Sequence, residues 1–173
     1  MHTHEASIKA AVAILTVSDT RSTTDDKSGA IIADCLEAAG HQVIHRELVR
    51  DEETEITIMV SGWGALLEVD AIVVTGGTGA SPRDVTPEAI LPLFSAKLSG
   101  FGELFRELSY KKIGTAAMQS RACAVLANGK YIFALPGSSG GVTDAWDGIL
   151  KYQLDINHKP CNFVELFPRL KEK

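Results

Sequence analysis

Two short runs of apolar residues constrain the fold of this chain most strongly. Residues 11–17 read Ala-Val-Ala-Ile-Leu-Thr-Val, and residues 71–75 read Ala-Ile-Val-Val-Thr. Neither run alternates apolar with polar residues, so each is expected to be a strand buried on both faces. Strands of this kind occur in parallel sheets that are covered by helices. The two runs therefore predict an α/β protein.

Helical patterns alternate with these strands. Apolar residues recur at helical spacing over residues 27–39, where Gly40 is expected to end the helix, and again at Ile56, Val60, Trp63 and Leu67. Between these two helices, residues 41–49 are expected to form another strand. This alternation predicts a three-layer α/β/α sandwich with a mostly parallel central sheet.

The second half of the chain continues the pattern. Thr86 and Pro87 are typical of a helix start, as capping residue and first helical residue. The pair Asn128-Gly129 predicts an antiparallel hairpin between strands over residues 121–126 and 130–135. Further helices are expected around residues 101–108 and 142–154. Residues 158–173 show little periodicity and are expected to form a C-terminal tail.

Composition limits the function classes. A chain of 173 residues with 45% hydrophobic residues is expected to form one domain, with residues 1–7 flexible. The net charge of −5 argues against broad binding to nucleic acid. Three widely spaced cysteines suggest neither a disulfide framework nor a zinc site. With no leader pattern and no run of about 18 apolar residues, a cytoplasmic protein without membrane contact is expected.

Four loops follow predicted strands and are expected to meet at one edge of the sheet. They span residues 18–26, 50–54, 76–84 and 136–141. Ligands of open α/β sheets bind beyond the carboxyl ends of the strands, where these loops lie. This convergence is the main argument for a functional site, because each loop alone is a weak signal.

The loop after residues 71–75 is rich in glycine. Gly76, Gly77 and Gly79, with Thr78 between them, let the backbone approach an anion closely. A tight turn without a ligand explains the same residues, and both interpretations stay open at this point. Arg83 favours a ligand, because a guanidinium pairs with phosphate through two hydrogen bonds.

Two aspartates follow neighbouring strands. Asp84 follows the glycine-rich loop, and Asp51 follows the strand over residues 41–49. Magnesium is commonly bound by one or two carboxylates together with substrate phosphates, so the pair predicts a Mg²⁺ site for phosphoryl or nucleotidyl transfer. The alternative for each aspartate is a helix cap, which is the commoner use of such a residue at the position of Asp51.

Two further loops are candidates for binding phosphate. One contains Pro136, Gly137 and Ser138, and the other contains Ser18 and Asp19. The alternatives are a cap of the following helix for Ser138 and a surface turn for the loop after Val17.

Five segments occur in a specific order over almost the whole chain. They are Leu15-Thr16-Val17-Ser18-Asp19, Thr75-Gly76-Gly77-Thr78-Gly79, Arg83-Asp84-Val85-Thr86-Pro87-Glu88, Gly100-Phe101-Gly102-Glu103 and Leu135-Pro136-Gly137-Ser138. In this combination the chain resembles the molybdopterin-binding domain of molybdenum cofactor biosynthesis. The segments at residues 119–122 and 159–163 are most similar to the protein B branch of that family.

The resemblance implies an activity and a set of residues. The activity is Mg²⁺-dependent adenylyl transfer from ATP to molybdopterin, with release of pyrophosphate. By motif, the functional aspartates fall on Asp51 and Asp84, and the two turns fall on residues 76–79 and 136–138. A non-catalytic molybdopterin carrier of the same pathway, and an unrelated nucleotide-binding enzyme, are the alternatives.

The resemblance also implies a symmetric homo-oligomer, a trimer or a hexamer, and contact with other molybdenum cofactor enzymes. The residues offer a separate argument for self-association. Phe101, Phe105, Phe163 and Phe167 are expected to be exposed, in excess of what one small surface should show.

Overall fold

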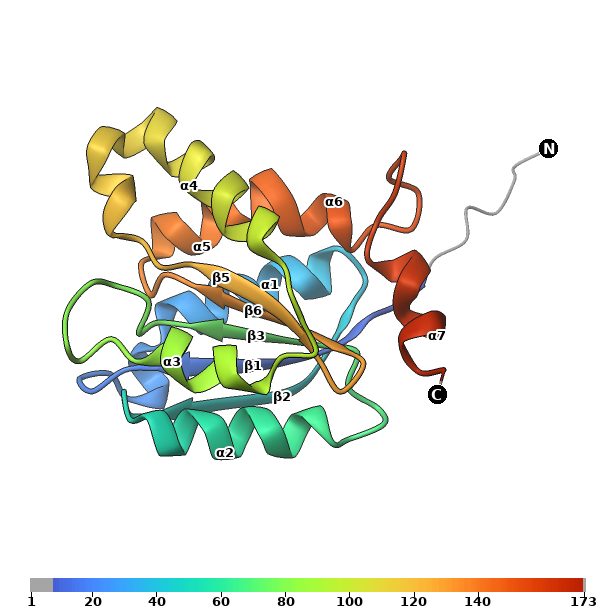
Figure 1. Ribbon diagram of the computed structural model, residues 1–173, viewed down its shortest axis with the longest axis horizontal. Helices are drawn as coiled ribbons and strands as arrows, with labels where there is room; N and C mark the ends of the chain where they lie inside the picture. The colour runs from blue at the N-terminus through green and yellow to red at the C-terminus, as the bar shows by residue number, and fades with distance from the viewer. Residues whose placement is uncertain (1–7, 173) are drawn as a thin grey trace.

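The computed structural model describes residues 8–172, so the expectation that residues 1–7 are flexible lies outside its range. Six strands and the helices between them alternate along the chain (Figure 1). The strands are β1 (Ala11–Val17), β2 (Gln42–Val49), β3 (Ala71–Thr75), β4 (Ala96–Lys97), β5 (Cys123–Ala127) and β6 (Lys130–Leu135). The α-helices are α1 (Lys27–Ala38), α2 (Glu53–Gly64), α3 (Thr86–Ile90), α4 (Ser99–Ile113), α5 (Ser139–Ala145), α6 (Lys151–Gln153) and α7 (Phe167–Leu170). A π-helical segment, Trp146–Leu150, connects α5 to α6.

The strands form one sheet in the order β2-β1-β3-β6-β5-β4. β2, β1, β3 and β6 are parallel, whereas β5 runs antiparallel to β6 and to β4. The predicted hairpin between β5 and β6 is confirmed, and Asn128 (φ 51°) and Gly129 (φ 70°) both have the positive φ that its tight turn requires. The chain leaves β1 and β3 in opposite directions across the sheet, which opens a crevice between their carboxyl ends.

Helices cover both faces of the sheet, as the sequence predicted (Figure 1). One hydrophobic core lies between the sheet and the layer of α1, α4 and α5, and includes Ile32, Phe105 and Trp146. The other lies between the sheet and α2 and α3, and includes Ile56 and Ile90. The residues of β3 are buried throughout, as expected of a central strand in a two-sided sandwich.

Local sequence explains where helix α1 begins and ends. The Asp26 side chain accepts a hydrogen bond from the backbone N–H of Gly29 at 2.9 Å, which caps the first turn. Gly40, with φ of 86°, follows the last turn, as predicted.

Three expectations about individual residues are wrong. Leu67 does not belong to α2, which ends at Gly64, and its side chain is exposed. Thr86 does not cap α3; it is the first residue of that helix, and its buried hydroxyl donates a hydrogen bond to the carbonyl of Gly76 at 2.8 Å. The set of phenylalanines is not an exposed patch, because Phe101, Phe105 and Phe167 are buried and Phe163 packs against the core.

The C-terminal tail closes one edge of the core. Phe163 lies 4.4 Å from Tyr131, measured between ring centroids, and Val164 and Phe167 are buried. Both described ends of the chain lie at the side of the sheet opposite the carboxyl ends of β1 and β3 (Figure 1). Within residues 8–172, none of the helices combines the length and apolar content that crossing a bilayer would require.

Candidate functional site

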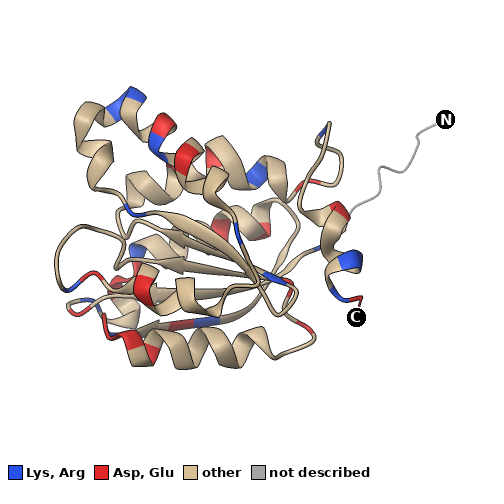
Figure 2. Ribbon diagram, in the orientation of Figure 1, with Lys and Arg blue, Asp and Glu red and all other residues tan. Residues whose placement is uncertain are grey.

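A cavity of about 480 Å³ lies at the carboxyl ends of β1, β3 and β6. It is lined by the loops that follow these strands and β2, together with Gln119 and Ser120, which precede β5. All but one of the residues predicted for the site line it: Ser18, Asp19, Asp51, Gly76, Gly77, Thr78, Gly79, Asp84, Pro136, Gly137 and Ser138. Arg83 is the exception. Acidic residues gather on the loops at this end of the sheet (Figure 2).

The glycine-rich loop lines the cavity, and its glycines lie so close to neighbouring groups that a side chain would not fit. Gly76 has φ of 106°, and a Cβ at this position would lie 2.1 Å from the carbonyl oxygen of Val17. Gly77 has φ of 64°, and a Cβ there would lie 2.8 Å from Oδ1 of Asp51. A Cβ at Gly79 would lie 2.8 Å from Oδ2 of Asp84. The loop therefore brings bare backbone within contact distance of both predicted metal ligands.

Asp51 is 9% exposed and is held by backbone groups. Its Oδ1 accepts a hydrogen bond from the N–H of Val85 at 3.1 Å, at the start of α3, and its own N–H donates to Asp19 at 3.1 Å. Asp51 thus does not cap α2, the helix that it precedes. Burial raises the pKa of the Asp51 carboxyl, and the nearby charges of Asp84 and Asp19 add to this increase, while the Val85 hydrogen bond opposes it.

Asp84 closes a turn next to the cavity. Its Oδ2 accepts a hydrogen bond from the N–H of Ser81 at 2.9 Å. Asp84 does not cap α3, whose N-terminal flanking residue is Val85. Partial burial acts to raise the pKa of the Asp84 carboxyl, but the hydrogen bonds from Ser81 and Gly79 and the charge of Arg121 outweigh it, so that this pKa is lowered. The two carboxylates therefore differ in their electrostatic environment.

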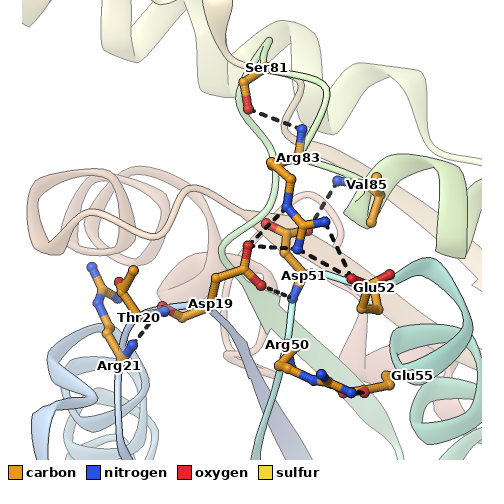
Figure 3. Close-up of polar contacts among 11 residues, drawn as sticks. Asp19, Thr20, Arg21, Arg50, Asp51, Glu52, Glu55, Ser81, Arg83 and Val85 are labelled. Carbon is orange, nitrogen blue, oxygen red and sulfur yellow. Dashed lines mark hydrogen bonds and ion pairs between the residues drawn. The ribbon is translucent and has the colours of Figure 1, made fainter.

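The guanidinium of Arg83 has carboxylate partners (Figure 3). It forms ion pairs with Asp19, at 2.8 Å, and with Glu52, at 3.3 Å. Its side chain is 60% exposed. The phosphate pairing that the sequence suggested would require Arg83 to leave both carboxylates. In the structure, Arg83 instead ties the loop after β1 to the loops after β2 and β3.

The second turn, residues 136–138, lines the cavity and leads into α5. The Ser138 hydroxyl accepts a hydrogen bond from the N–H of Gly141 at 3.1 Å and caps α5, as the simpler interpretation of this serine predicted. A Cβ at Gly137 would lie 3.1 Å from Cα of Gly76, so the two turns are in contact. Arg21 donates a hydrogen bond to the carbonyl of Gly137 at 2.9 Å and ties the loop after β1 to this turn.

Arg121 has a position that its motif alone did not reveal. Its side chain donates from Nε to the carbonyl of Gly79 at 2.7 Å and also contacts the carbonyl of Asp84 and the carboxylate of Glu88. Its backbone N–H donates to the carbonyl of Thr78 at 2.8 Å. The segment before β5 therefore holds the glycine-rich loop in place. No local pattern indicates this, because 42 positions separate Arg121 from Gly79.

The donor set fits Mg²⁺ that is also bound by substrate phosphates. In the described part of the chain, no group of three or more His, Cys, Asp or Glu side chains is arranged to hold a metal ion. Oδ2 of Asp51 accepts no hydrogen bond from residues 8–172, so a carboxylate oxygen in the cavity is free for a cation. Two carboxylates with phosphate oxygens are a normal Mg²⁺ environment.

Comparison with known proteins identifies relatives over almost the whole chain. The family model for a probable molybdopterin binding domain matches residues 13–155. Molybdenum cofactor biosynthesis protein B of Escherichia coli (strain K12) is 45% identical over 161 residues, which cover 93% of each chain. Its counterpart in Halalkalibacterium halodurans is 45% identical over 150 residues, 86% of this chain and 88% of the relative.

Solved structures agree with this comparison. A crystal structure of molybdenum cofactor biosynthesis protein B has a TM-score of 0.87 at 35% identity and covers 98% of this chain and 100% of that one. A tungsten cofactor synthesizing protein from Pyrococcus furiosus has a TM-score of 0.78 at 31% identity, with coverages of 96% and 100%. The resemblance drawn from the sequence motifs is confirmed, as is the α/β fold with a mostly parallel sheet.

Proposed function

The chain belongs to the molybdopterin-binding domain family of molybdenum cofactor biosynthesis proteins, and on that premise we propose that it is a single-domain molybdopterin adenylyltransferase. In the proposed reaction, a phosphate oxygen of molybdopterin attacks the α-phosphorus of ATP. A new phosphorus–oxygen bond forms, the bond between the α-phosphorus and the bridging oxygen breaks, and pyrophosphate leaves. No general base is needed, because a phosphate oxygen is already anionic.

The convergence of two carboxylates on the glycine-rich loop carries this proposal. Asp51 lies against Gly77 and Asp84 lies against Gly79, so that carboxylate oxygens and close-approach backbone face one cavity. A magnesium ion bound there would neutralise triphosphate charge and stabilise the leaving pyrophosphate. Asp51 and Asp84 are the residues that would hold it.

The remaining residues of the cavity position the substrates. Residues 76–79 and 137–138 border the cavity, and four of these six residues are glycines, which have no side chain to keep a phosphate away. Ser18 supports the loop after β1 by accepting hydrogen bonds from the N–H groups of Thr20 and Arg21. Positioning and charge neutralisation would thus supply most of the rate, as in other phosphoryl transfers.

Substitution of Asp84 by asparagine tests the proposal. Asn retains an oxygen that accepts the Ser81 hydrogen bond, so the turn should persist while the charge is lost. Wild-type protein should release pyrophosphate from ATP only when Mg²⁺ and molybdopterin are both present, and Asp84→Asn should not. Wild-type protein that binds molybdopterin without releasing pyrophosphate would support a non-catalytic carrier and overturn the enzyme proposal. ATP turnover that is indifferent to molybdopterin would also overturn it, in favour of an unrelated nucleotide enzyme.

We further propose that the protein acts in the cytoplasm as a homotrimer or homohexamer and contacts other molybdenum cofactor enzymes. The phenylalanines first considered do not support self-association, because they are buried or packed on the core. Exposed apolar side chains on α4 do support it, namely Leu104, Tyr110 and Ile113. Light scattering should give a multiple of the 18.5 kDa chain mass, and a monomer at micromolar concentration would contradict this assembly.

A further inference from the structure

Within residues 8–172, Arg21 is the only cationic side chain that lines the candidate site. Three carboxylates line the same cavity, those of Asp19, Asp51 and Asp84. The sequence suggested Arg83 as the partner of a phosphate, but Arg83 does not line the cavity. The Arg21 side chain comes from the loop after β1 and lies apart from those of Arg83 and Asp51 (Figure 3). The cavity therefore has one positive side chain, away from the two proposed metal ligands.

The guanidinium of Arg21 is held by uncharged groups. One of its terminal nitrogens donates to the hydroxyl of Ser28 at 3.0 Å, and the other donates to the carbonyl of Gly137 at 2.9 Å. Among the described residues it pairs with no carboxylate, whereas Arg83 pairs with both Asp19 and Glu52. A guanidinium carries more N–H donors than these two contacts use. Arg21 thus has a fixed position, unused donors and a charge that no neighbouring carboxylate balances.

The proposed reaction brings two anions into one cavity. One is the triphosphate of ATP, which the proposed Mg²⁺ would contact from Asp51 and Asp84. The other is the phosphate of the acceptor, whose oxygen must approach the α-phosphorus. Anionic oxygens repel one another strongly at such short range, and carboxylates in the cavity add to the repulsion. The acceptor phosphate therefore needs a positive partner of its own, and Arg21 is the side chain in the cavity that can supply it.

We propose that Arg21 binds the phosphate group of the acceptor substrate and orients it for attack, while Arg83 keeps its role of joining the loops. This inference rests on the proposed function. A guanidinium pairs with a phosphate through two parallel hydrogen bonds, which fix the direction of the phosphate as well as its position. Arg21 takes no part in bond making or proton transfer, so its contribution is binding and orientation.

The contacts of Arg21 place such a phosphate next to the glycine-rich loop. Arg21 is bound to the carbonyl of Gly137, and a Cβ at Gly137 would lie 3.1 Å from Cα of Gly76. The guanidinium is therefore anchored where the two turns meet. Ser28 is buried near the start of α1, so the second anchor of the guanidinium belongs to the core of the fold and not to a loop.

Titration of the protein with inorganic phosphate, followed by ³¹P NMR without nucleotide, pterin or metal ion, tests this inference. Wild-type protein should bind phosphate saturably. Arg21→Gln should bind it about tenfold more weakly, because glutamine retains an N–H donor but loses the charge. Arg21→Lys should fall between the two, because an ammonium retains the charge without the planar fork. Arg169→Gln is the matched control, since Arg169 is exposed on α7 and does not line the cavity.

Steady-state kinetics distinguish phosphate binding from a purely structural bridge between Ser28 and Gly137. Loss of the proposed contact should raise the KM for molybdopterin about tenfold in Arg21→Gln and leave the KM for ATP unchanged. A bridge that only supports the loops would affect both KM values alike, and that result would overturn the inference.

Two outcomes of the phosphate titration would also overturn it. One is failure of wild-type protein to bind phosphate. The other is equal binding by wild type and Arg21→Gln, which would result if phosphate bound instead to Lys97 and Arg106 in the neighbouring cavity of about 460 Å³. The titration involves no catalysis. Phosphate binding that depends on Arg21 in a protein that releases no pyrophosphate would therefore overturn the proposed function and leave the phosphate site at Arg21.

Discussion

The carboxylate of Asp51 accepts a hydrogen bond at 3.1 Å from the backbone N–H of Val85, a residue 34 positions away at the start of another helix. This contact joins the loop after β2 to the loop after β3, and the second oxygen of Asp51, which lines the cavity, accepts no hydrogen bond from residues 8–172. One oxygen therefore serves the fold while the other is available to a cation.

Replacement of Asp51 by asparagine should separate these two roles. Asn retains an acceptor for Val85, and it removes a buried carboxyl whose pKa burial raises, so thermal stability should be unchanged or increased. If the proposed reaction takes place, pyrophosphate release should fall by about a hundredfold or more, because the proposed metal site loses a charge. A variant with normal activity would show that Asp51 is only structural.

Gly76 should not tolerate a side chain. Gly76→Ala would place a Cβ 2.1 Å from the carbonyl oxygen of Val17 at φ of 106°, and should destabilise the fold by about 2 kcal/mol or more. Gly62→Ala is the control, because Gly62 lies in α2 with nothing within 4 Å of an added Cβ and should gain up to about 1 kcal/mol. Urea unfolding of both variants would measure the difference, and similar losses in the two would contradict the role given to Gly76.

Loss of the Arg121 side chain should loosen the site. Arg121→Ala leaves the carbonyls of Gly79 and Asp84 without these donors and should cost about 1–3 kcal/mol, with weaker Mg²⁺ binding by calorimetry. Arg50→Ala is the control, since Arg50 is exposed and pairs only with Glu55 in the described chain. Equal metal affinity in Arg121→Ala and wild type would show that the glycine-rich loop holds its shape unaided.

Stability should fall in mild acid because of His41. Burial lowers the pKa of this histidine from its ordinary 6.5, with the charge of Asp155 acting in the opposite direction, and its Nδ1 accepts a hydrogen bond from the N–H of Ala10 at 3.2 Å. The unfolded chain then binds the proton more readily than the folded one. The contribution of neutral His41 to the stability of the fold is therefore present above pH 6.5, and it is lost as the pH falls through the lowered pKa. His41→Gln does not titrate, so urea midpoints at pH 7.5 and pH 5 should differ less in this variant than in wild type.

The three cysteines should react at different rates. Burial raises the pKa of the Cys123 thiol to about 11, and burial also raises that of Cys35, with the charges of Asp147 and Asp34 adding to the effect. Cys161 is exposed. A thiol reagent at pH 8 should therefore modify Cys161 first. Cys161→Ser should remove the fast phase and leave the slow ones, and a fast phase that persisted would contradict this order.

Much of the fold followed from local patterns. The unbroken apolar runs at residues 11–17 and 71–75 indicated buried parallel strands, and Asn128-Gly129 indicated the hairpin. The predicted exposure of the phenylalanines was wrong. Phe101 and Phe105 repeat at helical spacing whether they face solvent or the sheet, and the spacing alone does not distinguish the two.

The sequence indicated which residues lie at the candidate site, but it did not indicate their hydrogen-bond partners. Asp84 and Ser138 were both interpreted as site residues or as helix caps, and the structure gives different answers: Ser138 caps α5, whereas Asp84 binds the N–H of Ser81 within its own turn. The partners of Arg83 and Arg121 had no signal in the sequence, because hydrogen-bond geometry between distant loops has no local pattern.

By itself, the sequence determined the types of element, the glycine-rich loop and the aspartates that follow the strands, because these depend on residues close together in the chain. Only the tertiary structure decided that Asp51 meets Gly77 and the start of α3, and that Asp84 lies against Gly79. The strand order β2-β1-β3-β6 brings those loops together. The physical reason is that strand order results from how the helices and the sheet bury their apolar faces together, which is a property of the whole chain.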